Sequence, residues 1–222
     1  LLYQSKSNLG FGKANNVGME LGLSRGADYF FLLNQDTRIE IDTISNLVKA
    51  SLSNPSYGVI SPLHLDSSGK KLDMGFENCL SKDYDKATIE TISYAKERIY
   101  GSQFINAAAW FVSRECLEKV GGFGYLFYHY GEDRDYVQRM KFYGIKLAFV
   151  TSATIIHDRE GNRFDLRNSN YPKIIWYYHT GSLCRLTDVN KSIFNAWLYV
   201  TWFNFRDLLY LSLKGKPAAT AA

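Results

Sequence analysis

An alternation of helix-like and strand-like segments in the first sixty residues is the strongest constraint on the fold. Residues 12–24 place apolar and small side chains at helical spacing, and Gly26 follows as a suitable C-terminal stop. Residues 28–33 form an apolar run of strand length, residues 42–52 return to helical spacing, and residues 57–60 predict another strand. This alternation predicts an α/β fold with a mostly parallel sheet flanked by helices.

The pattern weakens between residues 65 and 99, where the sequence leaves open an insertion, a long loop or a meander. An α/β nucleotide-binding domain normally starts with a strand and a βαβ unit. Because at most one strand precedes the first predicted helix, we expect the chain to lack its first βαβ unit. Periodicity returns later in the chain, over 104–112, in helices at 114–120 and 133–142, and in a strand at 146–150.

From residue 171 onward, aromatic and leucine side chains in helical register predict one or two amphipathic helices appended to the core. Asn195, Asn204 and Arg206 interrupt any apolar span of membrane-crossing length, so we do not expect a transmembrane helix. The aromatic side chains fit two alternatives. They pack against the core or a second subunit, as in a homodimer, or they lie on a membrane surface.

Composition excludes some classes of protein. The 26 basic and 22 acidic residues give a net charge of +4, which is too small to indicate nucleic-acid binding but suits a phosphate-bearing substrate or an anionic membrane. The three cysteines are far apart and lack zinc-ligand spacing, which suggests buried thiols in a reducing compartment. No signal peptide is visible, so we expect a cytoplasmic location. Peripheral contact with the inner face of the plasma membrane is compatible with that location.

The segment 8–18 combines glycines with asparagines before the first helix. Gly10 permits close backbone approach, and a helix start offers N–H groups to a phosphate. Asn8, Asn15 and Asn16 are the polar side chains of this segment. Taken alone, the same residues also fit an ordinary capped loop.

Asn34 and Asp36 follow an apolar strand, where α/β proteins bind ligands beyond the strand end. A carboxylate at this position can hold Mg²⁺, which often takes one or two protein carboxylates and substrate phosphate oxygens. The alternative is that Asp36 makes a turn or caps the following helix.

Three acids, Glu132, Asp133 and Asp135, lie within four residues at a predicted helix start. They suit the helix dipole, which is the structural explanation. Clustered acids also raise one another's pKa, so one of them can act as a general base. Arg139 lies one turn beyond Asp135 and can form an i,i+4 pair with it.

His157 ends another strand-like run, residues 151–156. A lone histidine at a strand end commonly has a structural role. In a cleft that also holds Asp36, it can supply a second metal contact or bind a diphosphate.

Together these segments resemble the inverting glycosyltransferase family 2, in particular its bacterial rhamnosyltransferase-like members. The order and spacing agree over residues 8–160. Asn34 takes the first position of the family's strand-end acidic motif, and Asp36 keeps the second. The matching segments are residues 8–18, 32–37, 101–123 and 131–139, together with His157.

The resemblance implies a GT-A-type fold over residues 1–165 and a helical appendage over residues 166–222. It implies displacement at the anomeric carbon with inversion, in which Asp133 deprotonates the acceptor hydroxyl and Asp36 binds Mg²⁺ or Mn²⁺. Glu132, Asp135 and Arg139 would support the base and the donor sugar. The residues expected near the nucleotide sugar are Asn8, Gly10, Asn15, Asn16, Asn34 and Asp36.

The expected partners are a UDP- or dTDP-linked sugar and a glycan or lipid-linked acceptor. A nucleotidyltransferase is a second enzymatic interpretation, but the chain has no Gly-rich segment with an activating Arg or Lys pair before residue 36. A third interpretation is a non-catalytic sugar- or partner-binding module derived from a truncated transferase.

Overall fold

The computed structural model describes residues 2–92, 94–158 and 171–213. The chain divides into two compact units, Leu1–Asn162 and Arg163–Ala222. The boundary expected from the sequence, between residues 165 and 166, lies outside the described residues.

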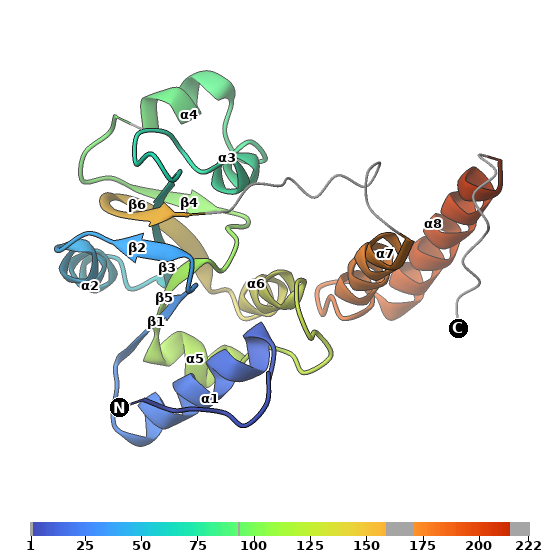
Figure 1. Ribbon diagram of the computed structural model, residues 1–222, viewed down its shortest axis with the longest axis horizontal. Helices are drawn as coiled ribbons and strands as arrows, with labels where there is room; N and C mark the ends of the chain where they lie inside the picture. Colours follow the sequence, from blue (N-terminus) through green and yellow to red (C-terminus); the bar gives the residue numbers. More distant parts are fainter. Residues whose placement is uncertain (1, 93, 159–170, 214–222) are drawn as a thin grey trace. The chain divides into compact units, whose positions relative to one another are not determined.

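The strands of the first unit form one mixed sheet (Figure 1). Its order is β1-β5-β3-β6-β2, and β4 also pairs with β6. The strands of the described part are β1 (Tyr29–Leu33), β2 (Thr37–Ile39), β3 (Tyr57–Leu65), β4 (Ile99–Ser102), β5 (Ala109–Ser113) and β6 (Lys146–His157).

The expected α/β fold is confirmed, but the sheet is less parallel than the sequence predicted. Among the described strands, only β3 and β6 pair in parallel. β5 lies between β1 and β3 and runs antiparallel to both, so β1, β3 and β6 all point the same way. The helix–strand alternation predicted the common direction of β1 and β3. It did not show that β5, which comes after the irregular segment, inserts between them.

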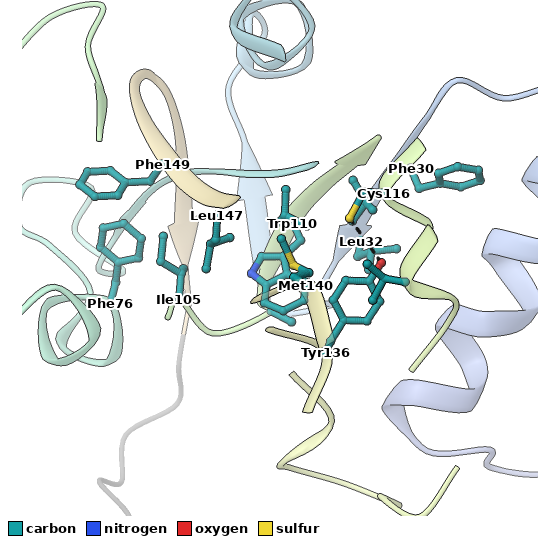
Figure 2. Close-up of a cluster of buried hydrophobic side chains, with 14 of the residues drawn as sticks. Phe30, Leu32, Phe76, Ile105, Trp110, Cys116, Tyr136, Met140, Leu147 and Phe149 are labelled. Atoms are coloured by element: carbon teal, nitrogen blue, oxygen red, sulfur yellow. Dashed lines mark hydrogen bonds between the residues drawn. The ribbon is translucent and has the colours of Figure 1, made fainter. Parts of the chain in front are cut away.

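Helices cover both faces of this sheet, because neighbouring strand residues point to opposite sides. Ile60, Phe111 and Val150 pack with Leu47 on one face. The other face carries the larger core, in which Trp110 packs with residues of the remaining helices (Figure 2). The helices of this unit are α1 (Phe11–Ser24), α2 (Thr43–Ser53), α3 (Met74–Leu80), α4 (Lys86–Ile92), α5 (Arg114–Val120) and α6 (Glu132–Phe142).

The segment between β3 and β4 contains two short helices, which resolves the alternatives that the sequence left open. Asp73 begins α3, and its side chain accepts a hydrogen bond from the N–H of Phe76. Asp85 precedes α4 and accepts in the same way from Thr88. The two helices supply Phe76, Leu80, Ile89 and Ile92 to the larger core.

β3 extends further than the sequence predicted, and β6 joins the two predicted strand-like runs 146–150 and 151–156. β3 continues through Pro62, where its register with β6 shifts, so that Pro62 pairs with Val150 and Leu63 pairs with Thr154. The irregularity suits Pro62, which has no N–H to donate to a ladder. β6 is continuous and carries His157 to the far end of the sheet.

The described part of the second unit contains α7 (Tyr171–Leu186) and α8 (Ile193–Leu213), where the sequence predicted one or two helices. Cys184, Ala196 and Val200 are buried between them, and the Arg185 guanidinium lies over the Tyr199 ring, 4.7 Å from its centroid. Among the described residues, no helix combines the length and hydropathy needed to span a membrane.

Candidate active site

One edge of the sheet gathers the predicted site residues. Because β1, β3 and β6 run in the same direction, their carboxyl ends meet at this edge, and antiparallel β5 begins there. Asn34 follows β1, His157 ends β6, and the segment 105–108 leads into β5. Ligands of open α/β sheets bind beyond such strand ends.

Asp36 and His157 come together at this edge. β2 pairs antiparallel with the end of β6, which places Thr37 opposite His157. The Asp36 carboxylate Oδ1 then lies 3.5 Å from His157 Nε2. The Asp36 side chain is 43% exposed and that of His157 only 2%, so the pair has one open side and one buried side. A carboxylate oxygen and an imidazole nitrogen in this position suit a divalent metal ion.

Two further buried groups lie behind His157, and the sequence did not reveal either. Asp73 Oδ1 is 3.9 Å from His157 Nδ1, and the His64 ring lies edge-on to His157 with 6.1 Å between centroids. One potential ligand atom from each of the three residues lies within 4.8 Å of the others. Asp73 lies in the segment that the sequence left open, and nothing in its spacing linked it to His157.

The start of α1 lies against the segment that precedes α6. Gly10 has φ +76°, and a Cβ there would sit 2.4 Å from the Tyr128 carbonyl oxygen, so glycine is required. Asn8 accepts a hydrogen bond from the Gly10 N–H, and Asn15 donates to the Phe11 carbonyl within α1. The predicted contacts of these residues with a nucleotide stay predictions.

Asn16, Asp135 and Arg139 converge on the turn between α5 and α6. The Asn16 side-chain amide exchanges two hydrogen bonds with the Phe123 backbone. Arg139 donates to the carbonyls of Val120 and Gly122 and pairs with Asp135 at 3.0 Å. These contacts tie α1 and α6 to the turn between α5 and α6. Their expected role in donor binding stays a prediction.

Glu132 is a buried acid at the start of α6, with 5% of its surface exposed. Its Oε2 has no hydrogen-bond partner within the described part of the chain. Burial, which disfavours the charged form, raises the Glu132 pKa to about 7, and the neighbouring Asp133 charge adds to this effect. A Cβ at Gly12 would lie 3.7 Å from the Glu132 Cβ, so Glu132 is beside the first turn of α1.

Asp133 is half-buried and lies next to the segment that leads into β5. Burial raises the pKa of its carboxyl group, while the Arg134 N–H and charge and the Ala107 N–H act in the opposite direction. Ala108 in turn accepts a hydrogen bond from the Asn34 N–H at 2.9 Å. Asp133 and Asn34 are therefore both in contact with the segment before β5.

Two cations flank an aromatic ring in the same region. Lys82 Nζ is 5.5 Å from the Phe104 ring centroid, and Arg134 Cζ is 5.7 Å from it. Both cations are exposed, and neither takes part in an ion pair with another described residue. This cation pair lies beside Asp133, whose pKa burial raises and the Arg134 charge lowers.

A hollow of about 380 Å³ lies elsewhere, between α2, the start of β4 and the middle of β6. Asn46, Lys49 and Arg98 are among its lining residues, and it contains none of the predicted site residues. It is separate from the edge that carries Asp36 and His157.

No protein-family model matches the chain. It is 25% identical to the N-acetylglucosaminyl-diphospho-decaprenol L-rhamnosyltransferases of two Mycobacterium tuberculosis strains, CDC 1551 / Oshkosh and ATCC 25618 / H37Rv. These alignments cover 71% of this chain and 58% of each relative.

The crystal structure of GalNAc-T7 with UDP, GalNAc and Mn²⁺ matches with a TM-score of 0.52 at 14% identity, over 97% of this chain and 46% of that one. The fold is of the GT-A glycosyltransferase type. The expected GT-A architecture and the resemblance to a rhamnosyltransferase are thus confirmed.

Proposed function

We propose that this chain is a metal-dependent, inverting glycosyltransferase that moves a sugar from a nucleotide-diphosphate donor to a hydroxyl of a glycan or lipid-linked acceptor. One observation carries the proposal. In a GT-A fold, the 3.5 Å pair of Asp36 and His157 lies on the sheet edge that Asp133 approaches through the segment before β5. The proposed donor, acceptor and stereochemistry are supported by the chemistry of the residues described below and by the similar proteins.

The residues present fit a divalent metal ion. Adjacent ligand atoms around an ion with bonds of about 2.0–2.2 Å are roughly 3 Å apart, close to the 3.5 Å between Asp36 Oδ1 and His157 Nε2. Mg²⁺ or Mn²⁺ held by these two residues would act as a Lewis acid toward the departing diphosphate. Asp36 offers the open side that a substrate phosphate needs, since its side chain is partly exposed.

The start of α1 suits the donor phosphates and nucleoside. Its first N–H groups have no partners within the helix and carry the positive end of the helix dipole. No acidic side chain occupies the first turn of α1, so an anion there meets no opposing charge from that turn. Asn8, Gly10 and Asn15 are the residues that we assign to this side of the donor.

Asp133 is the proposed base. Its carboxylate takes the proton of the acceptor hydroxyl, the acceptor oxygen bonds to the anomeric carbon from the face opposite the leaving group, and the nucleotide diphosphate departs with the electron pair. A pKa raised by burial makes this carboxylate a better proton acceptor. Glu132 lies behind Asp133 on the α1 side and adds negative charge only when it ionises.

A diphosphate-bearing acceptor fits the surface beside Asp133. The similar rhamnosyltransferases act, by their names, on a diphospho-decaprenol acceptor. In this chain Lys82 and Arg134 flank Phe104 next to the proposed base, so an anionic diphosphate would meet two cations while its sugar hydroxyl approaches Asp133. A lipid-linked acceptor also requires contact with a membrane surface.

Calorimetric titration of UDP and dTDP, with and without Mn²⁺, tests the proposal. We expect one nucleotide to bind tightly only with Mn²⁺, and we expect Asp36→Asn to abolish the metal dependence. Asp85→Asn is the matched control, since Asp85 is an exposed acid at the start of α4. Nucleotide binding that is indifferent to both Mn²⁺ and Asp36 would refute the metal site.

A further inference from the structure

His157 lies between two carboxylates of different character. Asp36 Oδ1 faces its Nε2 at 3.5 Å, and Asp73 Oδ1 faces its Nδ1 at 3.9 Å. The Asp36 side chain is 43% exposed, whereas that of Asp73 is 7% exposed. The imidazole thus has a solvent-facing nitrogen beside one acid and a buried nitrogen beside the other.

Asp73 is held in place by both its backbone and its side chain. Its N–H donates to the His64 carbonyl at 2.9 Å, which ties it to the end of β3. Its Oδ1 accepts from the Phe76 N–H at 2.9 Å, as the cap of α3. The carboxylate oxygen that faces His157 is therefore fixed by two separate elements.

A neutral imidazole carries its hydrogen on only one nitrogen. The attraction of a carboxylate for that hydrogen is stronger where water is excluded, because the effective dielectric constant is lower. Asp73 lies farther from its nitrogen than Asp36 does, but it is the more buried of the two acids, which favours the hydrogen on Nδ1. The Nε2 lone pair then points toward Asp36, as a metal ligand must.

We propose that Asp73 is a positioning residue for His157: it holds the ring with Nδ1–H toward itself and thereby presents Nε2 to Asp36 and to a divalent ion. The role of the ion rests on the proposed function, but the orientation of the ring does not. At 3.9 Å the Asp73–His157 contact is longer than a hydrogen bond, and we expect it to shorten when Nε2 binds a metal. Metal-ligating histidines commonly have such a carboxylate on the far nitrogen.

His64 completes the buried group on the same side. The Ser61 hydroxyl donates to the Pro62 carbonyl, so its contact with His64 Nε2 at 3.0 Å has the imidazole as donor. In the neutral ring this leaves Nδ1 of His64 as the acceptor nitrogen. An ion seated among His64, Asp73 and His157 is the competing arrangement, and the experiments below separate it from a positioning role for Asp73.

Ring ¹⁵N NMR of the metal-free protein tests the orientation directly. We expect neutral His157 to carry its hydrogen on Nδ1 in the wild type, and Asp73→Asn to lower the population of this tautomer. Asparagine is a good helix cap, so the variant removes the charge while α3 keeps its first hydrogen bond. An Nε2–H tautomer in the wild type, or the same tautomer population in both proteins, would overturn the proposal.

Mn²⁺ affinity, measured by electron paramagnetic resonance, supplies the second test. We expect Asp73→Asn to weaken Mn²⁺ binding about 10–100-fold, whereas Asp85→Asn, which removes the matching carboxylate cap of α4, leaves it unchanged. Binding that survives Asp36→Asn but is lost in His64→Ala would place the ion in the buried group and overturn the positioning role. If the wild type binds no Mn²⁺, the proposed metal site fails, and the tautomer measurement alone decides the role of Asp73.

Discussion

Asn16 and Phe123 lie 107 residues apart in the sequence, yet the Asn16 side-chain amide and the Phe123 backbone form two hydrogen bonds, of 2.7 and 2.9 Å. This pairing imitates a short piece of β-ladder between α1 and the turn before α6. It requires Gly122, because a Cβ there would lie 2.5 Å from Asn16 Oδ1. The turn between α5 and α6 is therefore tied to a residue of α1.

A double-mutant cycle tests this dependence. Asn16→Ala leaves two buried backbone groups of Phe123 without these partners and should cost about 2–4 kcal/mol of unfolding free energy. Gly122→Ala should also destabilise, but less in the Asn16→Ala background, where the space is free. Urea denaturation of the four proteins measures the coupling, which we expect at about 0.5–3 kcal/mol.

Gly18→Ala is the control for this cycle. Gly18 is an exposed glycine of α1 with nothing within 4 Å of an added Cβ. The alanine should stabilise the protein slightly, by up to about 1 kcal/mol, through helix propensity. Strictly additive effects of Asn16→Ala and Gly122→Ala would show that the amide and the glycine do not interact.

Asp133→Asn tests the proposed base. The amide cannot accept the acceptor proton, so we expect kcat to fall by about 10²–10⁴-fold. Donor affinity, measured by calorimetry with Mn²⁺, should stay near the wild-type value, since Asp133 is assigned to the acceptor and not to the donor. Turnover like that of the wild type would exclude Asp133 as the base.

Glu132→Gln tests the effect of burial on the fold. The Glu132 pKa rises in the folded protein from its ordinary 4.5 to about 7, so the unfolded chain releases this proton at a lower pH. The resulting penalty is absent below about pH 4.5, grows between pH 4.5 and 7, and is complete above pH 7. At 1.36 kcal/mol for each pKa unit, it reaches roughly 3 kcal/mol.

Denaturation of wild type and Glu132→Gln at pH 4, 6 and 8 measures this penalty. We expect the variant to gain stability relative to the wild type as the pH rises, with most of the change between pH 4.5 and 7. A stability difference that is constant over this range would mean that Glu132 is not protonated in the folded protein near pH 6.

Lys82→Ala and Arg134→Ala test the anionic acceptor. Because both side chains are exposed and screened by solvent, each loss should raise KM for a diphosphate-bearing acceptor by only about 5-fold, and the effect should shrink in high salt. An acceptor without diphosphate should show no change. Lys70→Ala, which removes another exposed lysine, is the control. An equal rise in KM for both acceptors would show that Lys82 and Arg134 do not bind the diphosphate.

Local signals in the sequence were sufficient for several elements. α5 has the predicted bounds because Ser113 caps its start and Gly121, with φ +81°, ends it. The sequence did not predict the position of β5, because strand pairing depends on contacts between distant segments. The sequence also did not predict that β3 continues through Pro62. A proline ordinarily ends a strand, and the pairing with β6 that continues the strand joins distant segments.

The candidate site divides in a similar way. The strand-end positions of Asp36 and His157 were readable from apolar runs that end in a polar residue, and the β2–β6 pairing brings the two side chains together. Asp73 and His64 were not readable, because a helix cap and a histidine within an apolar strand have no linear relation to residue 157. From the sequence, Asn16 was expected near a nucleotide. Only the folded chain reveals that its side chain forms two hydrogen bonds with the Phe123 backbone.

The reversed direction of β5 has a consequence for protein engineering. Asp36 precedes β2 and His157 ends β6, whereas the segment before β5, which Asp133 contacts, lies on the other side of β3. Substitutions at the exposed end of the segment 103–108, away from the buried Ile105, Ala107 and Ala108, would therefore alter this flank and leave the strands beside Asp36 and His157 intact. If the proposed function holds, the donor side and the acceptor side of this edge can be redesigned one at a time.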